Sequence, residues 1–261
     1  MPELSGKRVL VTRPRAQMAE FAAALQAAGA EPVCLPVIEI GPAPDPIALD
    51  RALLKLGCYD WLALTSVNGV DAVWKRLQAL HLTDLPPTLR VAAIGPKTAE
   101  ALAGRGVTPD FVPEEYVAEA LLPGLGDLRG RWVLLPRADL ARPALAEAIR
   151  AAGGVAHEIA AYRTLPARPD PAGLEALKAG TDVVTFTSSS TVRNFAALAS
   201  AAGLDPLRLP GSPVFACIGP ITAATAQGEG FVVSVVAQEY TTAGLVQALE
   251  TYFKKTQKGT Q

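Results

Sequence analysis

The chain has 261 residues. A typical domain has about 100–200 residues, so we expect two domains or one large one. Half of the residues are hydrophobic and 19% are charged. A chain of this composition can bury a large core, which excludes an intrinsically disordered protein. The 24 basic and 25 acidic residues give a net charge of −1. This balance favours neither nucleic acid nor an anionic membrane as a partner.

The cysteines and histidines argue against a disulfide framework and against a metal site. Cys34, Cys58 and Cys217 lie far apart, without a CxxC pair, so we expect them to be reduced, buried thiols. His81 and His157 have no potential metal ligands at suitable spacing beside them. We therefore predict that no metal is bound.

The ends of the chain and its apolar stretches indicate a cytoplasmic protein. Residues 1–7 lead directly into an apolar strand, so we expect no signal peptide. The most apolar stretch, residues 213–226, is too short to span a bilayer and contains a proline.

An internal duplication with a period of about 124 residues runs through the sequence. Arg13 and Arg137 follow similar apolar triplets, and Ile94-Gly95-Pro96 recurs as Ile218-Gly219-Pro220. Further matches at nearly the same offset are Asp60, Thr65 and Ser66 with Asp182, Thr187 and Ser188, and Gly106, Glu115, Tyr116 and Leu121 with Gly230, Glu239, Tyr240 and Leu245. One register kept over this length indicates a duplicated structural unit.

Strands and helices alternate within each repeat. In the first repeat we predict strands at 8–11, 61–65 and 91–94, and helices at 16–28, 67–79 and 97–103, the helices being rich in Ala and Leu. Continuous apolar strands separated by helices predict an α/β fold with a parallel sheet covered on both faces. Each repeat has room for about five strands, as in a flavodoxin-type domain.

Two proline-rich stretches, 41–50 and 163–172, occupy equivalent places in the repeats and predict the linkers between two lobes. The first lobe would then be discontinuous, with residues 1–40 and 173–261, and the second would contain 51–162. Two contiguous domains divided near 123–131 are the alternative.

Four predicted helix starts follow strand ends at matched places in the repeats. A helix start offers free backbone N–H groups and the positive end of the helix dipole, and ligands of open parallel sheets bind at this edge. The alternative for each start is ordinary N-capping by Ser, Thr or Asn. Four matched starts favour a cleft for a polyanion. The residues concerned are Thr65, Ser66, Asn68, Gly95, Lys97, Thr98, Thr187, Ser188, Ser189, Gly219 and Thr222.

Other catalytic motifs are absent from the sequence. It contains no Walker-type phosphate loop and no GxSxG nucleophile elbow, and neither histidine is placed for a triad. The pattern therefore predicts a two-lobed protein that binds its ligand without a nucleophile or a metal.

The sequence resembles uroporphyrinogen-III synthase over nearly its whole length, to about Leu249. The motifs that carry the resemblance are Val11-Thr12-Arg13-Pro14, Thr65-Ser66-Val67-Asn68-Gly69-Val70, Ile94-Gly95-x-x-Thr98-Ala99, Tyr162-Arg163-Thr164, Phe186-Thr187-Ser188 and Ile218-Gly219-Pro220-x-Thr222-Ala223. The resemblance implies two flavodoxin-like lobes with parallel sheets, joined by two extended linkers. It also implies a substrate, the linear tetrapyrrole hydroxymethylbilane with its eight carboxylates, and no cofactor.

The reaction implied by the resemblance removes the terminal hydroxyl, closes the macrocycle and inverts the last pyrrole ring. The family's helix-start threonines correspond to Thr98 and Thr222, and its cleft tyrosine to Tyr162. Arg13, Arg137 and Lys97 are expected to add positive charge near the bound substrate, a structural role being the alternative for each.

Tyr162 is the candidate catalytic residue because the repeat alignment places Ile38 opposite it. A neutral phenol can donate a hydrogen bond to the departing hydroxyl without repelling a polycarboxylate. The alternative is that its ring packs on the linker.

Two other functions remain open at this point. The chain could be a non-catalytic, two-lobed protein that binds tetrapyrroles or other anions, or a flavodoxin-like electron carrier. The second would need aromatic residues in loops that here hold Ser, Thr and Gly. We expect a monomer with a small-molecule substrate.

Overall fold

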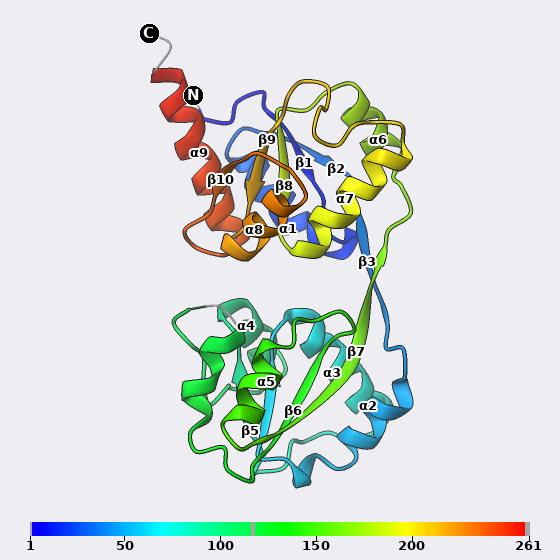
Figure 1. The fold of residues 1–261 in the computed structure, drawn as a ribbon, viewed down its shortest axis with the longest axis vertical. Coiled ribbons are helices and arrows are strands. Elements are labelled where there is room, and N and C mark those ends of the chain that lie inside the picture. Colours follow the sequence, from blue (N-terminus) through cyan, green and yellow to red (C-terminus); the bar gives the residue numbers. More distant parts are fainter. Residues whose placement is uncertain (1, 116–117, 259–261) are drawn as a thin grey trace. The chain divides into compact units, whose positions relative to one another are not determined.

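The computed structural model describes residues 2–115 and 118–258. It forms two compact units, which we call unit 1 (1–39 and 165–261) and unit 2 (40–164) (Figure 1). Each unit contains one five-stranded sheet. The predicted α/β class with parallel sheets is confirmed. Neighbouring strands pair in parallel in the sheet of unit 1 and in the sheet of unit 2.

Unit 1 has the strand order β10-β9-β8-β1-β2. Numbered along this unit alone, the order is 2-1-3-4-5, as in flavodoxin-like folds. One face of the sheet packs against α1 and α9 through residues such as Phe21 and Leu249, and the other against a cluster that includes Phe186 and Phe195. Its elements are β1 (Arg8–Val11), α1 (Met18–Ala27), β2 (Glu31–Cys34), α6 (Pro171–Lys178), β8 (Val183–Phe186), α7 (Ser189–Ala201), β9 (Val214–Cys217), α8 (Pro220–Gly228), β10 (Val233–Val236) and α9 (Thr242–Lys258).

Unit 2 has the strand order β3-β7-β6-β4-β5. Its sheet is also buried on both faces: Leu62 and Leu64 point into a cluster with α2 and α3, and Trp61 and Ala63 into one with α5. This alternation along a four-residue strand explains why β4 is buried at every position. The elements are β3 (Ile38–Pro42), α2 (Pro46–Leu53), β4 (Trp61–Leu64), α3 (Val67–Ala79), β5 (Arg90–Ala93), α4 (Pro96–Ala103), β6 (Trp132–Ala138), α5 (Ala144–Ala151) and β7 (Val155–Pro166), with short 3₁₀ segments at Leu56–Cys58 and Ala118–Leu125. A third 3₁₀ segment, Arg15–Gln17, belongs to unit 1.

The chain passes between the units at Glu39–Ile40 and at Thr164–Leu165. Both passages lie in strands, β3 and β7, which neighbour each other in the sheet order. The second passage lies inside the stretch 163–172 that we expected as a linker, and the first lies one residue before the expected stretch 41–50.

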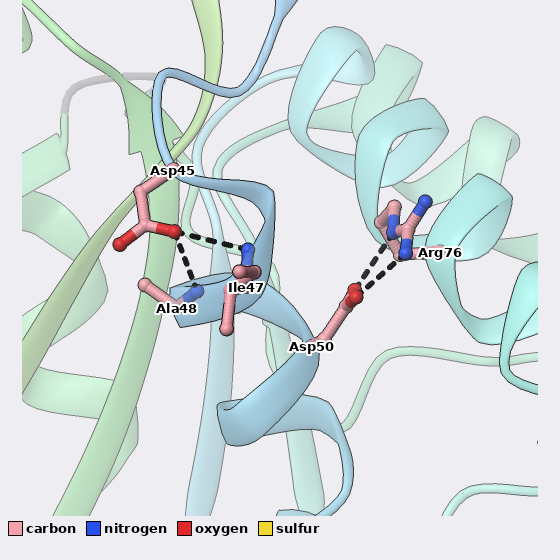
Figure 2. Close-up of polar contacts among 5 residues, drawn as sticks. All are labelled: Asp45, Ile47, Ala48, Asp50 and Arg76. Carbon is pink, nitrogen blue, oxygen red and sulfur yellow. Dashed lines mark hydrogen bonds and ion pairs between the residues drawn. The ribbon is translucent and has the colours of Figure 1, made fainter.

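The second half of the expected 41–50 linker is a helix of unit 2 (Figure 2). Asp45 is the N-cap of α2 and accepts hydrogen bonds from the N–H groups of Ile47 at 3.0 Å and Ala48 at 3.1 Å. Asp50 then pairs with Arg76 of α3 at 2.6 Å. The proline density that suggested a linker thus includes Pro at the first position of a helix, where its missing N–H costs nothing.

The stretch 163–172 contains the second passage between the units, but its end also belongs to a helix. Pro171 begins α6, and Asp170 caps it by accepting from the Gly173 N–H at 3.1 Å. Proline at a helix start and proline in a linker give the same local composition, so composition alone could not separate them.

The cysteine prediction is wrong for two of three residues. Cys34 and Cys58 are exposed, because Cys34 ends the edge strand β2 and Cys58 lies in a surface turn. Cys217 is buried in β9, and burial raises the pKa of its thiol to about 12.

Candidate functional site

The predicted site residues of unit 2 lie at the edge of the sheet where β4, β5 and β6 end, with Tyr162 at the same level on the neighbouring β7. Strands β4 and β5 run parallel with Leu64 opposite Ala93, so α3 and α4 start at the same edge of the sheet. On the other side of β4 lie β6 and then β7, with Ala138 opposite Tyr162. This edge therefore brings together Thr65, Ser66, Asn68, Gly95, Lys97, Thr98, Arg137 and Tyr162.

Unit 1 repeats this arrangement with its own strands. Parallel pairing of β1 with β8 and of β8 with β9 aligns their carboxyl ends. The predicted residues at this edge are Arg13 after β1, Thr187, Ser188 and Ser189 after β8, and Gly219 and Thr222 after β9.

The starts of α4 and α8 are open. Their N-caps are Gly95 and Gly219, with φ of −174° and −177°, and within the described residues neither start has a side-chain cap. Thr98 and Thr222 lie in the first turn, 4% and 5% exposed. The alternative that these threonines cap their helices is therefore wrong.

Pro96 and Pro220 occupy the first helical position of α4 and α8 and have no N–H. The Thr98 N–H donates to the Gly95 carbonyl at 3.1 Å. These starts therefore attract an anion mainly through the positive end of the helix dipole.

The surroundings of one of these caps favour glycine. A Cβ on Gly219 would lie 3.2 Å from the ring of Tyr240, so the ring would have to shift. Tyr116, the repeat partner of Tyr240, lies outside the described residues.

The starts of α3 and α7 are capped by serine. Ser66 Oγ accepts from the Gly69 N–H at 3.0 Å. Ser188 forms a reciprocal capping box with Thr191, and Ser189 Oγ lies 2.7 Å from Thr225 Oγ1 of α8. Capping, the alternative we considered for these serines, is present, so any further role of Ser66 or Ser188 must be compatible with it.

Tyr162 lies with its ring in the apolar core of unit 2 and is 8% exposed. Its hydroxyl is 3.0 Å from Ser66 Oγ and also hydrogen-bonds with the Asn68 side chain. Burial raises the pKa of the phenol; the hydrogen bonds with Ser66 and Asn68 lower it, Asp139 raises it and Arg137 lowers it, with a raised pKa as the result. The phenol is therefore protonated at neutral pH.

The two matched arginines differ in their environment. Arg137 is buried, pairs with Glu158 at 2.8 Å and donates to the Arg142 carbonyl. Arg13 donates to Gln17 Oε1 at 3.0 Å, but its buried Nε has no partner among the described residues. Burial lowers the pKa of Arg13. Arg137 is thus held within its own unit, whereas Arg13 retains unused donor capacity.

Lys97 is half-exposed at the start of α4 and lies 3.3 Å from Glu100. The two residues are three positions apart in one helix and both are solvent-exposed, so this ion pair is weak.

Sequence reasoning assigned no site role to two residues that contact Tyr162 or Ser66. Asp139 follows β6; its N–H donates to the Tyr162 carbonyl at 3.1 Å, and its carboxylate accepts from the Thr164 N–H at 3.4 Å. Gly69 approaches β6 closely, since a Cβ there would lie 3.2 Å from the Pro136 carbonyl oxygen. The available signals in the sequence are that Asp139 follows a strand end and that Gly69 follows the Ser-x-Asn motif.

The described part of the chain contains no group of three or more His, Cys, Asp or Glu side chains arranged to hold a metal ion. Over residues 2–115 and 118–258, no helix has both the length and the apolar character needed to cross a bilayer.

Comparison with known proteins places this geometry in a family. Residues 19–247 match the family model described as uroporphyrinogen-III synthase HemD. The uroporphyrinogen-III synthase of Synechococcus elongatus is 38% identical over 259 residues, which cover 97% of this chain and 98% of that protein. A putative uroporphyrinogen-III synthase of Methanothermobacter thermautotrophicus is 31% identical over 245 residues, covering 92% and 96% respectively.

A solved structure shares the fold. The crystal structure of a mutant uroporphyrinogen III synthase from the extremely thermophilic bacterium Thermus thermophilus aligns with a TM-score of 0.66 and 24% identity, covering 96% of this chain and all of that one. With the family model spanning most of the chain and relatives matching it nearly end to end, the chain belongs to the uroporphyrinogen-III synthase family.

Proposed function

We propose that this protein converts hydroxymethylbilane into uroporphyrinogen III by closing the macrocycle with loss of water and inversion of the last pyrrole ring. The observation that carries this proposal is the family membership over nearly the whole chain. The open helix starts of α4 and α8 support it, because the positive ends of helix dipoles suit a substrate with many carboxylates.

The chemistry of the substrate explains why this site can work without a nucleophile. Electron-rich pyrroles expel the terminal hydroxyl themselves, so the protein has to fold the substrate until the inner carbon of the last ring attacks before the outer one. Orientation and electrostatic complementarity supply this control. We assign the carboxylates to the helix starts, with Lys97 and Arg13 adding positive charge.

The departing hydroxyl needs a proton. Tyr162 is the proposed source, because its phenol is protonated at neutral pH and lies at the same sheet edge as the α3 start. Arg137, held by Glu158, would favour the charged form of that phenol rather than bind a carboxylate.

We further propose that the protein acts as a cytoplasmic monomer on this small molecule, without a nucleic-acid or membrane partner. Sedimentation of the purified protein and fractionation of the source cells test these two points.

The activity is tested by a coupled assay with freshly prepared hydroxymethylbilane and separation of the type I and type III products. We expect predominantly type III product at a rate proportional to protein concentration. Type I product at the rate of the protein-free reaction would contradict the proposal.

A further inference from the structure

The hydroxyl of Ser66 lies between the buried phenol and the open edge of the sheet. Ser66 Oγ accepts from the Gly69 N–H at 3.0 Å and is 3.0 Å from the Tyr162 hydroxyl. A serine hydroxyl has two acceptor positions and one proton to donate. If Tyr162 donates to it, both acceptor positions are occupied, and the serine proton must be directed elsewhere.

Exposure shows which of the two hydroxyls a ligand can reach. Tyr162 is 8% exposed and its ring lies in the apolar core with Leu64 and Ile159. Ser66 is half-buried and is the N-cap of α3, at the edge where the helix starts lie. A substrate bound at this edge therefore meets the serine hydroxyl before the phenol.

We propose that Ser66 delivers the proton to the departing hydroxyl and that Tyr162 acts through Ser66, as a positioning residue and as the source of the proton. This inference deepens the proposed function and rests on it. It also gives Ser66 a second role beside capping, since the Gly69 N–H uses only one of its acceptor positions.

Loss of the hydroxyl is coupled to proton transfer from the two side chains. The carbon–oxygen bond of the hydroxymethyl group breaks, its electron pair leaves with the oxygen, and that oxygen takes the Ser66 proton and departs as water. Ser66 takes the proton of Tyr162, which becomes a phenolate. The inner carbon of the last ring joins the former hydroxymethyl carbon, its bond to the bridge from the third ring breaks, and that bridge carbon bonds to the outer carbon of the last ring. The outer carbon then loses its hydrogen as the ring regains aromaticity, and that proton returns to the phenolate by the same route.

The surroundings of the phenol allow this transient charge. The Asn68 side chain hydrogen-bonds the phenol oxygen, and the Arg137 guanidinium favours the charged form, while the Asp139 carboxylate opposes it. Water is a far weaker acid than a phenol, so proton transfer from a phenol to a departing hydroxide is downhill.

The other copy of the site has a different construction. The matching serine, Ser188, is part of a capping box with Thr191. The residue that aligns with Tyr162 is Ile38, whose side chain belongs to the apolar core of unit 1. The relay is therefore a feature of unit 2 that the duplicated sequence does not repeat.

The first test separates the relay from the cap. Glycine is nearly as good an N-cap as serine, so Ser66→Gly removes the hydroxyl with little loss of helix stability. We expect kcat for type III product to fall by about 10- to 100-fold with KM within about threefold of wild type, as for loss of a general acid. Ser66→Thr restores a hydroxyl and should restore most of kcat.

Asp45→Ala is the matched control, because Asp45 caps α2 in the same unit and lies outside the site (Figure 2). It should lower Tm and leave kcat unchanged. A Ser66→Gly protein with wild-type kcat would overturn the relay.

A double variant distinguishes the relay from the proposed function. If the two hydroxyls act as one unit, Ser66→Gly with Tyr162→Phe should be no slower than the slower single variant. If the falls in kcat of the two single variants multiply in the double variant, Tyr162 reaches the substrate independently of Ser66. This result overturns the relay but leaves Tyr162 as the proton source. Normal kcat in Tyr162→Phe overturns both roles, whereas a wild-type protein without type III product overturns the proposed function itself.

A spectroscopic measurement tests the contact without turnover. In protein labelled with ¹³C at the tyrosine ζ carbon, the Tyr162 signal is identified by its loss in Tyr162→Phe, and its titration reports the phenol pKa. Ser66→Gly should raise this pKa, because it removes a hydrogen bond that lowers it, whereas Asp45→Ala should leave it unchanged. An unchanged titration in Ser66→Gly would contradict the relay.

Discussion

At the scale of single residues, the matched pair Arg13 and Arg137 shows how duplicated positions acquire different roles. Arg137 has its charge neutralised by Glu158, so it contributes to the stability of unit 2. Arg13 is half-buried, and its buried Nε has no partner among the described residues. A buried polar atom without a partner costs folding free energy, and such sites are retained mainly where they serve binding.

Arg13→Met tests this interpretation. Methionine keeps the length of the side chain and removes the cost of burying a charge, so we expect the free energy of unfolding to stay equal or rise by about 1 kcal/mol. We also expect KM for hydroxymethylbilane to rise by about tenfold, which is the loss of one charged contact of ~1.4 kcal/mol. Chemical denaturation and steady-state kinetics give the two quantities.

Arg137→Met is the comparison variant. It breaks an ion pair whose carboxylate is partly exposed, so unfolding free energy should fall by about 1–2 kcal/mol. Loss of stability in Arg13→Met, together with unchanged KM, would make Arg13 a structural residue as well.

At the scale of elements, each sheet has an aspartate that joins two of its strands, and the two aspartates occupy equivalent places in the repeats. Asp60 accepts from the Trp132 N–H at 2.8 Å and the Arg131 side chain at 2.7 Å. Asp182 accepts from the Arg8 N–H and the Lys7 ammonium, both at 2.9 Å. Each aspartate thus ties a strand of one repeat to a strand of the other.

These aspartates predict an acid-sensitive part of the stability. For both carboxyls burial acts to raise the pKa, but the backbone hydrogen bond and the neighbouring cation outweigh it and hold the pKa below its ordinary value. The unfolded chain then binds more protons, so their contribution is present above about pH 4 and is lost as the pH falls through the folded-state pKa.

Asp60→Asn and Asp182→Asn should each lower the free energy of unfolding by about 1 kcal/mol at pH 7 and reduce its decline between about pH 5 and pH 2. Urea denaturation across this pH range measures both effects. Variants with the same acid decline as wild type would show that other carboxyls cause it.

The open helix starts give a second prediction at this scale. Thr98→Val and Thr222→Val leave the caps at Gly95 and Gly219 intact, so we expect turnover to fall by about tenfold with a stability loss of at most ~1 kcal/mol. Melting curves and the type III assay test this together. A lower Tm with normal activity per folded molecule would leave the threonines as packing residues.

At the scale of the whole molecule, each unit is assembled from both repeats. The first repeat supplies β1 and β2 to unit 1 and β4 and β5 to unit 2, while the second supplies β6 and β7 to unit 2 and β8, β9 and β10 to unit 1. The unit of duplication and the unit of folding are therefore different segments of the chain.

Fragments of the chain test this difference. Residues 40–164 contain both apolar clusters of unit 2, so this fragment should unfold cooperatively by itself. Residues 1–124 contain one repeat but place β1 without its partner β8, so they should show no cooperative transition. A folded 1–124 fragment and an unfolded 40–164 fragment, compared by circular dichroism during heating, would reverse the assignment.

The sequence was informative where local pattern and tertiary structure agree. The helix 67–79 was predicted at its observed bounds because its cap, apolar spacing and length all favour one structure. The sheet edges were also predictable, since each motif follows a strand. What local pattern could not supply were the partners: the pairing of Arg137 with Glu158, and the contact of Tyr162 with Ser66, join residues 21 and 96 positions apart.

The central claim is that the protein makes the inner carbon of the last pyrrole ring attack the hydroxymethyl carbon. Hydroxymethylbilane labelled with ¹³C at both of these carbons tests it by NMR of the product. We predict a one-bond carbon–carbon coupling between the two labels, because inversion joins them directly. A product formed at the enzymatic rate without that coupling would show closure through the outer carbon and would contradict the account.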